Sequence, residues 1–205
     1  AGRLMAREGT VRRIVVVISG ATGAIYGIRL LQILRDVPGV ETHLVISNPA
    51  KRTIVQETEM TVRQVEELAN VAYDNKDIGA SLASGSFRTA GMVIAPCSIK
   101  TAAGLAYGFA DTLLIRAGDV TLKEGRPLAL LVRETPLHLG HLRMLAHLAE
   151  NGAVILPPMP AFYNRPKTLD DIINHTLGRV LDRLGIEQRL VPEWEGTRTP
   201  RGGET

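Results

Sequence analysis

The feature that most constrains the fold of this chain is an alternation of short apolar runs with longer segments of helical periodicity. Runs rich in valine, isoleucine and leucine predict five strands, at residues 13–18, 40–46, 92–95, 128–132 and 153–156. Amphipathic patterns predict helices at residues 23–36, 49–69, 98–108, 110–124, 138–151 and 168–184. Strands separated by helices are joined by crossover connections, so we predict an α/β protein with helices flanking a mostly parallel sheet.

Length and composition indicate one domain with an aliphatic core. A chain of 205 residues is long enough to bury a single core, and an aromatic content of 4% leaves aliphatic side chains to fill it. Polar, aperiodic ends predict a flexible N-terminal segment at 1–12 and a tail at 192–205, with the folded domain at 13–191 between them. Trp194 in the tail could dock on a neighbouring subunit.

The sequence disfavours several functional classes. The formal net charge is only +3 and the basic residues are scattered, which argues against nucleic-acid binding. No apolar run approaches the roughly 20 residues that span a membrane, and no signal peptide is recognisable, so we expect a cytoplasmic protein. The single cysteine, Cys97, is expected to be a small buried residue. His138 and His141 have no further ligand beside them, so no metal site is predicted.

Small, hydroxyl-bearing and charged residues follow the predicted strands. In a parallel sheet the carboxyl ends of the strands share one edge, and ligands bind there near the switch in strand order. The residues that follow the strands include Gly20 to Gly23, Ser47, Ser98 with Lys100 and Thr101, Arg133 with Glu134, and the segment leading to Tyr163. A ligand site is therefore predicted at this edge.

The first of these loops points to a single phosphate. Its glycines, at positions 20, 23 and 27, do not match the spacing of the dinucleotide fingerprint. Glycines still permit close approach of the backbone, and the next helix is expected to offer unpaired N–H groups to an anion. A tight turn without any ligand is the alternative. Ser47 and Ser98 have a similar double interpretation, because each could cap a helix as well as face a ligand.

Four cations are candidates for binding an anion: Lys123, Arg126, Arg133 and Arg179. Arg133 stands out, because it ends an apolar run at the predicted ligand edge, where a phosphate or carboxylate would be its partner. Glu134 and Glu57 are candidates for moving protons. Apart from Arg133, each of these residues, taken alone, is more often a solvated surface charge.

The sequence as a whole resembles the UbiX-type flavin prenyltransferases, a family of flavoproteins related to flavin-dependent cysteine decarboxylases. The resemblance runs from about Arg13 to Pro192. It is carried by the stretches "SGATGAIYGIRLL", "ASGSF", "VIAPCSIKTAAGLAYGFADTLLIRAGDVTLKEGRPLALLVRETPL" and "GAVILPPMPAFYNRP". The long third stretch is the most specific of the four.

The resemblance implies a Rossmann-like three-layer fold and a homo-oligomer, typically a dodecamer. It implies transfer of a dimethylallyl group from dimethylallyl phosphate to N5 and then C6 of reduced FMN, without a metal. The product is the prenylated FMN that UbiD-type decarboxylases use. The resemblance leaves open the exact oligomer, the subunit that supplies each phosphate ligand, the length of the prenyl chain, and the preference for phosphate or diphosphate.

Site residues follow from the resemblance by position. The FMN-binding positions are Gly20, Ala21, Thr22, Ser47, Ser98, Ile99, Lys100, Thr101 and Arg133. Those around dimethylallyl phosphate are Lys123, Arg133, Tyr163 and Arg179, and those implicated in catalysis are Glu57, Lys123, Glu134 and Tyr163. Two positions depart from many relatives: Thr22 replaces a serine but keeps the hydroxyl, and Ile78 stands near where some relatives have a tryptophan.

Two other functions remain possible from the sequence. A flavin-dependent cysteine decarboxylase would typically carry an asparagine-methionine motif where this chain has "PPMPAFYNRP". A non-catalytic FMN carrier would need the FMN loops but not Lys123, Glu134, Tyr163 and Arg179 together. A direct aromatic-acid decarboxylase is disfavoured, because the sequence shows no evident set of residues that would act on a substrate carboxylate.

Overall fold

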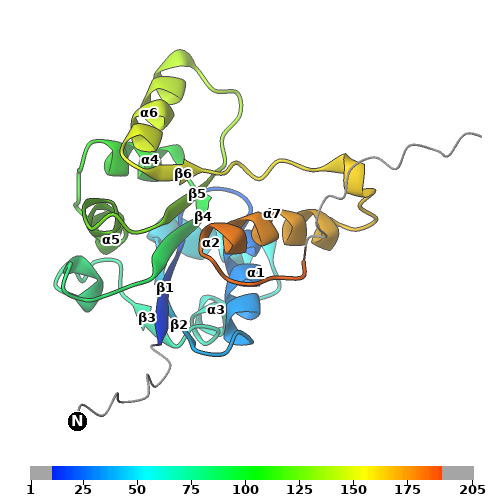
Figure 1. Ribbon diagram of the computed structural model, residues 1–205, viewed down its shortest axis with the longest axis horizontal. Coiled ribbons are helices and arrows are strands. Elements are labelled where there is room, and N and C mark those ends of the chain that lie inside the picture. The colour runs from blue at the N-terminus through cyan, green and yellow to red at the C-terminus, as the bar shows by residue number, and fades with distance from the viewer. Residues whose placement is uncertain (1–10, 191–205) are drawn as a thin grey trace, which may run out of the picture.

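The computed structural model describes residues 11–190 and contains one six-stranded sheet with the order β3-β2-β1-β4-β5-β6 (Figure 1). All neighbouring strands are parallel. The strands are β1 (Arg12–Ile18), β2 (Val40–Ile46), β3 (Val71–Tyr73), β4 (Gly91–Cys97), β5 (Leu128–Val132) and β6 (Ala153–Ile155). The predicted α/β class and parallel sheet are confirmed.

Helices cover both faces of this sheet and make the three layers. They are α1 (Ala24–Arg35), α2 (Asn48–Glu57), α3 (Val62–Glu66), α4 (Ile99–Ala106), α5 (Leu113–Lys123), α6 (Leu139–Glu150) and α7 (Leu169–Arg183), with two short 3₁₀ helices, η1 (Ser81–Ala83) and η2 (Phe162–Asn164). In the described part of the chain, no helix is long and apolar enough to cross a membrane.

Two aliphatic cores lie on opposite faces of the sheet. Alternate residues of β1 point to opposite sides, with Ile14 and Val16 in one core and Val15 and Val17 in the other. The first core is completed by α1, α2, α3 and α7, and the second by η1, α4, α5 and α6. After β6, the chain crosses from the side of α6 to that of α7, and η2 lies on this crossing segment (Figure 1).

The predicted helix over 49–69 is wrong. The chain forms α2 and α3 instead, with Thr58 between them in an extended conformation at φ −136° and ψ 163°. Thr61 then starts α3 with a capping box, in which its hydroxyl accepts from the Gln64 N–H and the Gln64 side chain accepts from the Thr61 N–H. Threonine side chains that bond to nearby backbone groups therefore interrupt an otherwise helical pattern.

The other differences are small. The edge strand β3 was missed, because three largely exposed residues carry little periodicity. Arg12 begins β1, although it was expected to lie in the N-terminal segment. The expectations for residues 1–10, for the tail at 192–205 and for Trp194 lie outside the described residues.

A polar network lies against the second core beneath η1. His43 is buried, with Nε2 2.7 Å from Glu41 Oε1 and Nδ1 2.9 Å from the Tyr73 hydroxyl. Glu41 also accepts from Arg13 Nε at 3.2 Å, and the Tyr73 hydroxyl lies 3.0 Å from Ser81 Oγ. Burial lowers the pKa of His43, and the hydrogen bond from His43 is the main reason that the pKa of Glu41 is lowered.

These two shifts predict a loss of stability in acid. Both pKa values are depressed in the folded state, so the unfolded chain binds more protons as the pH falls through about 6.5 and towards about 4. The midpoint of thermal unfolding should therefore fall between about pH 7.5 and about pH 5, and His43→Gln should make that fall shallower. The same change at His147, an exposed histidine of α6, is the control. Equal slopes in the wild type and His43→Gln would contradict the prediction.

Candidate functional site

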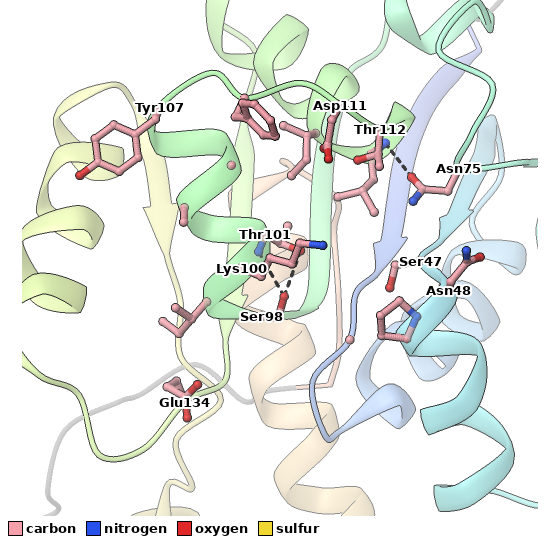
Figure 2. Close-up of a pocket in the computed structure, with 18 residues that line it drawn as sticks. Ser47, Asn48, Asn75, Ser98, Lys100, Thr101, Tyr107, Asp111, Thr112 and Glu134 are labelled. Atoms are coloured by element: carbon pink, nitrogen blue, oxygen red, sulfur yellow. Dashed lines mark hydrogen bonds between the residues drawn. The ribbon is translucent and has the colours of Figure 1, made fainter.

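A pocket of about 680 Å³ opens at the carboxyl edge of the sheet, beside the ends of the neighbouring strands β2, β1 and β4 (Figure 2). The connections from β1 and β4 run to opposite sides at this point, so it is the switch in strand order where ligands bind in such sheets. The lining residues come from five regions: the strand-end loops, the start of α2, α4, the loop before α5, and α5. They are Gly20, Ser47, Asn48, Pro49, Asn75, Ser98, Ile99, Lys100, Thr101, Ala103, Gly104, Tyr107, Phe109, Asp111, Thr112, Leu114, Ile115 and Glu134.

Ser19 connects the strand ends beside the pocket. Its buried hydroxyl donates to the Pro96 carbonyl at 2.9 Å and accepts from the Ser98 N–H at 2.8 Å. The Ser19 N–H also donates to the Pro96 carbonyl, at 3.2 Å. The end of β1 is thereby fixed to the end of β4 and to the residue that starts α4.

Ser98 forms the N-cap of α4 in the pocket wall. Its hydroxyl oxygen accepts from the Thr101 N–H at 3.2 Å and its proton is directed to Thr101 Oγ1 at 3.0 Å. The first turn of α4 also carries Ile99 and Lys100, which line the same pocket. A helix N-terminus with hydroxyls and an ammonium group favours an anion. The predicted capping role of Ser98 is confirmed.

The opposite wall is the start of α2. Ser47 is buried, its hydroxyl accepts from the Ala50 N–H at 3.2 Å, and its own N–H donates to the Ile18 carbonyl at 3.0 Å. Gly20 packs against this helix so closely that an added Cβ would lie 2.5 Å from Pro49 Cβ. Figure 2 shows Ser47 and Asn48 on one side of the pocket and Lys100 on the other.

The start of α1 differs from the prediction. The N–H groups of Gly23 and Ala24 donate to Glu57 Oε2, at 2.8 and 3.1 Å, so these two groups are not unpaired as expected. Gly23 has a φ of 95°, in the left-handed region that favours glycine. Glu57 at the end of α2 is thus a cap for α1, and neither Glu57 nor Ala21 nor Thr22 is among the residues that line the pocket.

Arg133 and Glu134 lie at the end of β5. The Arg133 N–H donates to the Cys97 carbonyl at 3.0 Å, which continues the pairing of β5 with β4. Arg133 is half-buried and is not among the residues that line the pocket. Glu134 is exposed at the margin of the pocket (Figure 2). Glu134 Oε1 accepts from the Thr135 N–H at 3.2 Å.

Three further predicted residues lie away from this pocket in their own chain. Lys123 ends α5 and pairs with Glu124. Because α5 begins at the pocket with Leu113, Lys123 lies about 15 Å further along its axis. Tyr163 is on η2, 62% exposed. Arg179 on α7 pairs with Asp182 at 3.6 Å. Since α5 and α7 cover opposite faces of the sheet, one chain does not present Lys123 and Arg179 at one place.

The sequence analysis missed three polar residues that line the pocket near the start of α5: Asn75, Asp111 and Thr112. Asn75 follows the unpredicted strand β3, and its Oδ1 and backbone carbonyl accept from the Leu114 and Leu113 N–H groups, at 3.1 and 2.9 Å. Asp111 and Thr112 were assigned to a helix over 110–124, but α5 begins only at Leu113. The hydroxyl residue directly before the apolar run was a signal for this later start.

Cys97, His138 and His141 do not form a nucleophilic or metal-binding site in the described part of the chain. Cys97 is buried, as predicted, and burial raises the pKa of its thiol to about 12, so the thiolate is not formed at neutral pH. His138 is the N-cap of α6, and its ring stacks on His141 with centroids 3.5 Å apart. Among residues 11–190, no three histidine, cysteine, aspartate or glutamate side chains cluster as a metal site would require. Ile78 is exposed.

Comparison with known proteins gives consistent relatives. The Flavoprotein family model matches residues 4–180. The flavin prenyltransferase UbiX of Escherichia coli (strain K12) is 58% identical over 187 residues, which cover 90% of this chain and 99% of that protein.

Solved structures give the same relatives. AnUbiX (PadA1) in complex with FMN and dimethylallyl pyrophosphate has a TM-score of 0.89 at 45% identity, over 91% of this chain and 99% of that chain. A dodecameric FMN-dependent UbiX-like decarboxylase from Escherichia coli O157:H7 has a TM-score of 0.88 at 50% identity, over 90% of this chain and 100% of that chain. The FMN-dependent cysteine decarboxylase TvaF, at 14% identity and a TM-score of 0.62 over 85% of this chain and 98% of that chain, shares the fold alone.

The contacts of Glu57 predict a measurable effect on stability. Glu57→Ala removes the acceptor for two N–H groups at the start of α1 and should lower the free energy of unfolding by about 1–2 kcal/mol. Glu57→Gln keeps a neutral acceptor and should lose less. Denaturant unfolding of the three proteins tests this, with Glu59→Ala as a nearby exposed control. A Glu57→Ala protein as stable as the wild type would show that this carboxylate does not cap α1.

Proposed function

Because this chain belongs to the flavoprotein family, and within it to the UbiX-type flavin prenyltransferases, we propose that it joins a dimethylallyl group to reduced FMN. The donor is dimethylallyl phosphate and the new bonds form at N5 and C6 of the flavin. The observation that carries this proposal is the pocket at the switch point, which is walled by the strand-end loops and the first turn of α4.

The residues of the pocket fit a flavin nucleotide. The N-cap hydroxyl of Ser98, the Lys100 ammonium and the first turn of α4 suit a phosphate group. Apolar side chains of α4 and α5, such as Ile99 and Ile115, suit a flat ring system, and the volume is that of a small-molecule site. We assign FMN binding to Gly20, Ala21, Thr22, Ser47, Ser98, Ile99, Lys100, Thr101 and Arg133.

The prenyl phosphate needs cations that the pocket of one chain does not hold. Lys100 is the one basic residue among the described lining residues. We therefore propose that Lys123, Tyr163 and Arg179 reach the phosphate from other copies of the chain and join Arg133 there. A homo-oligomer, with the dodecamer of the Escherichia coli O157:H7 relative as its expected form, brings them together.

These residues account for the departure of the phosphate. The bond between the allylic carbon C1 and the ester oxygen breaks, and its electron pair leaves with the phosphate. The charges of Lys123, Arg133 and Arg179 and the hydroxyl of Tyr163 stabilise that developing charge. The reduced flavin supplies the electron-rich N5 and C6 atoms. N5 bonds to C1 and gives up its proton. A proton then adds to C2 of the allyl double bond, C3 bonds to C6, and the proton lost from C6 passes to Glu134, at the pocket margin, or to the released phosphate. Glu57 acts by holding the start of α1.

The product identifies the next protein. Prenylated FMN is used by UbiD-type decarboxylases, so we propose that such an enzyme receives it, in the cytoplasm and without a metal in the transfer step. No observation in the structure favours a cysteine decarboxylase or a direct aromatic-acid decarboxylase. A carrier would bind FMN and leave it unchanged.

One experiment tests the reaction. The protein is incubated without oxygen with reduced FMN and dimethylallyl phosphate, and the extracted flavin is weighed by mass spectrometry. We expect a flavin heavier by one C5H8 unit, and a parallel reaction with dimethylallyl diphosphate reports the preferred donor. Unchanged FMN from protein that binds both ligands would reject the transferase and favour the carrier.

Shared sites predict complementation between inactive variants. Lys123→Ala and Arg179→Ala should each lose most activity as uniform oligomers. Co-expressed in equal amounts, they should regain about a quarter of the wild-type activity, because random assembly gives that fraction of sites both intact residues from different subunits. Recovery is measured as prenylated flavin per subunit. No recovery would contradict the proposal that Lys123 and Arg179 come from different chains.

A further inference from the structure

Tyr163 has a polar partner with no role in the assignments above. Its hydroxyl lies 3.1 Å from Nε2 of His175, and the two rings meet edge to face with centroids 5.9 Å apart and an interplanar angle of 84°. Tyr163 comes from η2 on the exposed crossing segment, whereas His175 is half-buried on α7. The contact therefore fixes an exposed side chain to a packed helix.

Helix geometry places this pair beside Arg179. Residues four apart lie on one face of a helix, so His175 and Arg179 face the same side of α7. Asp171, one turn earlier, directs its carboxylate to the N–H groups of Lys167 and Thr168, at 2.8 and 3.0 Å. Arg179 is held by Asp182 at 3.6 Å. The Tyr163–His175 contact and Arg179 thus lie on one face of α7, and Tyr163 and Arg179 are both proposed phosphate ligands.

The direction of the hydrogen bond decides what Tyr163 can do. A phenol has a single proton. If Tyr163 donates it to His175, the hydroxyl has no proton left for a ligand. If His175 donates from Nε2 instead, the phenol oxygen accepts that bond and can donate its own proton elsewhere. A phosphate ester offers oxygen acceptors, so it requires the second arrangement.

We propose that His175 is a positioning residue for the prenyl-donor site: it donates its Nε2 proton to Tyr163 and so directs the phenol proton to the phosphate. This inference rests on the proposed function and adds a residue to it. His175 acts only through Tyr163 and touches neither substrate. Loss of one such hydrogen bond should lower kcat/KM for the prenyl donor about three- to tenfold.

Three substitutions at His175 separate positioning from folding. His175→Gln places an amide N–H near the position of Nε2 and should retain most activity. His175→Asn is shorter, cannot reach Tyr163, and should lose the three- to tenfold. His175→Phe keeps the ring and removes the donor, and should match His175→Asn. His147→Phe is the matched control, because His147 also stacks on a tyrosine, Tyr107, at 6.2 Å, but its Nε2 faces the Asn151 amide and not the tyrosine hydroxyl. Tyr107 lines the pocket, so the FMN affinity of this variant is measured as well.

The decisive measurement is kcat/KM for dimethylallyl phosphate at saturating reduced FMN, with FMN affinity and thermal unfolding measured for each variant. We expect FMN affinity to be unchanged in all of them. In a Tyr163→Phe background, His175→Phe should cause no further loss, because the hydroxyl through which His175 acts is gone.

Each outcome decides the matter. Equal losses for His175→Gln and His175→Asn, or an undiminished effect of His175→Phe in the Tyr163→Phe background, would overturn the positioning role. So would full activity of His175→Phe. A wild-type protein that binds both ligands and makes no prenylated flavin would reject the proposed function and this inference with it, whereas the other outcomes bear on His175 alone.

Discussion

The buried hydroxyl of Ser19 is the contact on which the geometry of the site depends. It donates to the Pro96 carbonyl and accepts from the Ser98 N–H, so both its hydrogen-bonding capacities are used between β1 and β4. These strands are neighbours in the sheet but distant in sequence, and the loops that follow them form the two sides of the switch point. Without the hydroxyl, the part-buried Ser98 N–H would lose its partner, at a cost of about 1–3 kcal/mol, whereas the Pro96 carbonyl would keep the Ser19 N–H. This side chain therefore adds to the pairing of β1 with β4 in fixing the start of α4 relative to the Gly20 loop.

Local signals in the sequence made much of this architecture predictable. The apolar runs were long enough to identify five of the six strands, and the parallel order that they imply placed Ser47, Ser98 and Glu134 at one edge of the sheet. A very short strand and contacts between residues distant in the sequence could not be predicted in this way. Three exposed residues could not reveal β3, so Asn75 was missed with it. The break at Thr58 depended on side chains competing for backbone groups, and the carboxylate of Glu57 reaches α1 across 34 residues, which no local pattern records.

The family resemblance supplied a shared role that local patterns could not. From the sequence alone Lys123 and Arg179 were candidate cations like many surface charges, and only the resemblance grouped them with Tyr163 around one phosphate. The structure adds a geometric reason for this appearance. Each lies outside the pocket of its own chain, and Lys123 and Arg179 belong to helices on opposite faces of the sheet. A residue that reaches the site of another subunit must be exposed in its own subunit, as these three are. His175 became visible only because the fold brings α7 beneath η2.

The placement of α5 and α7 on opposite faces has a consequence for how such an enzyme is switched on. If Lys123 and Arg179 reach the prenyl phosphate from different subunits, as proposed, a single subunit lacks the cations that release it. Catalysis would then begin at assembly rather than at folding, and the output of prenylated flavin would rise more steeply than the number of chains.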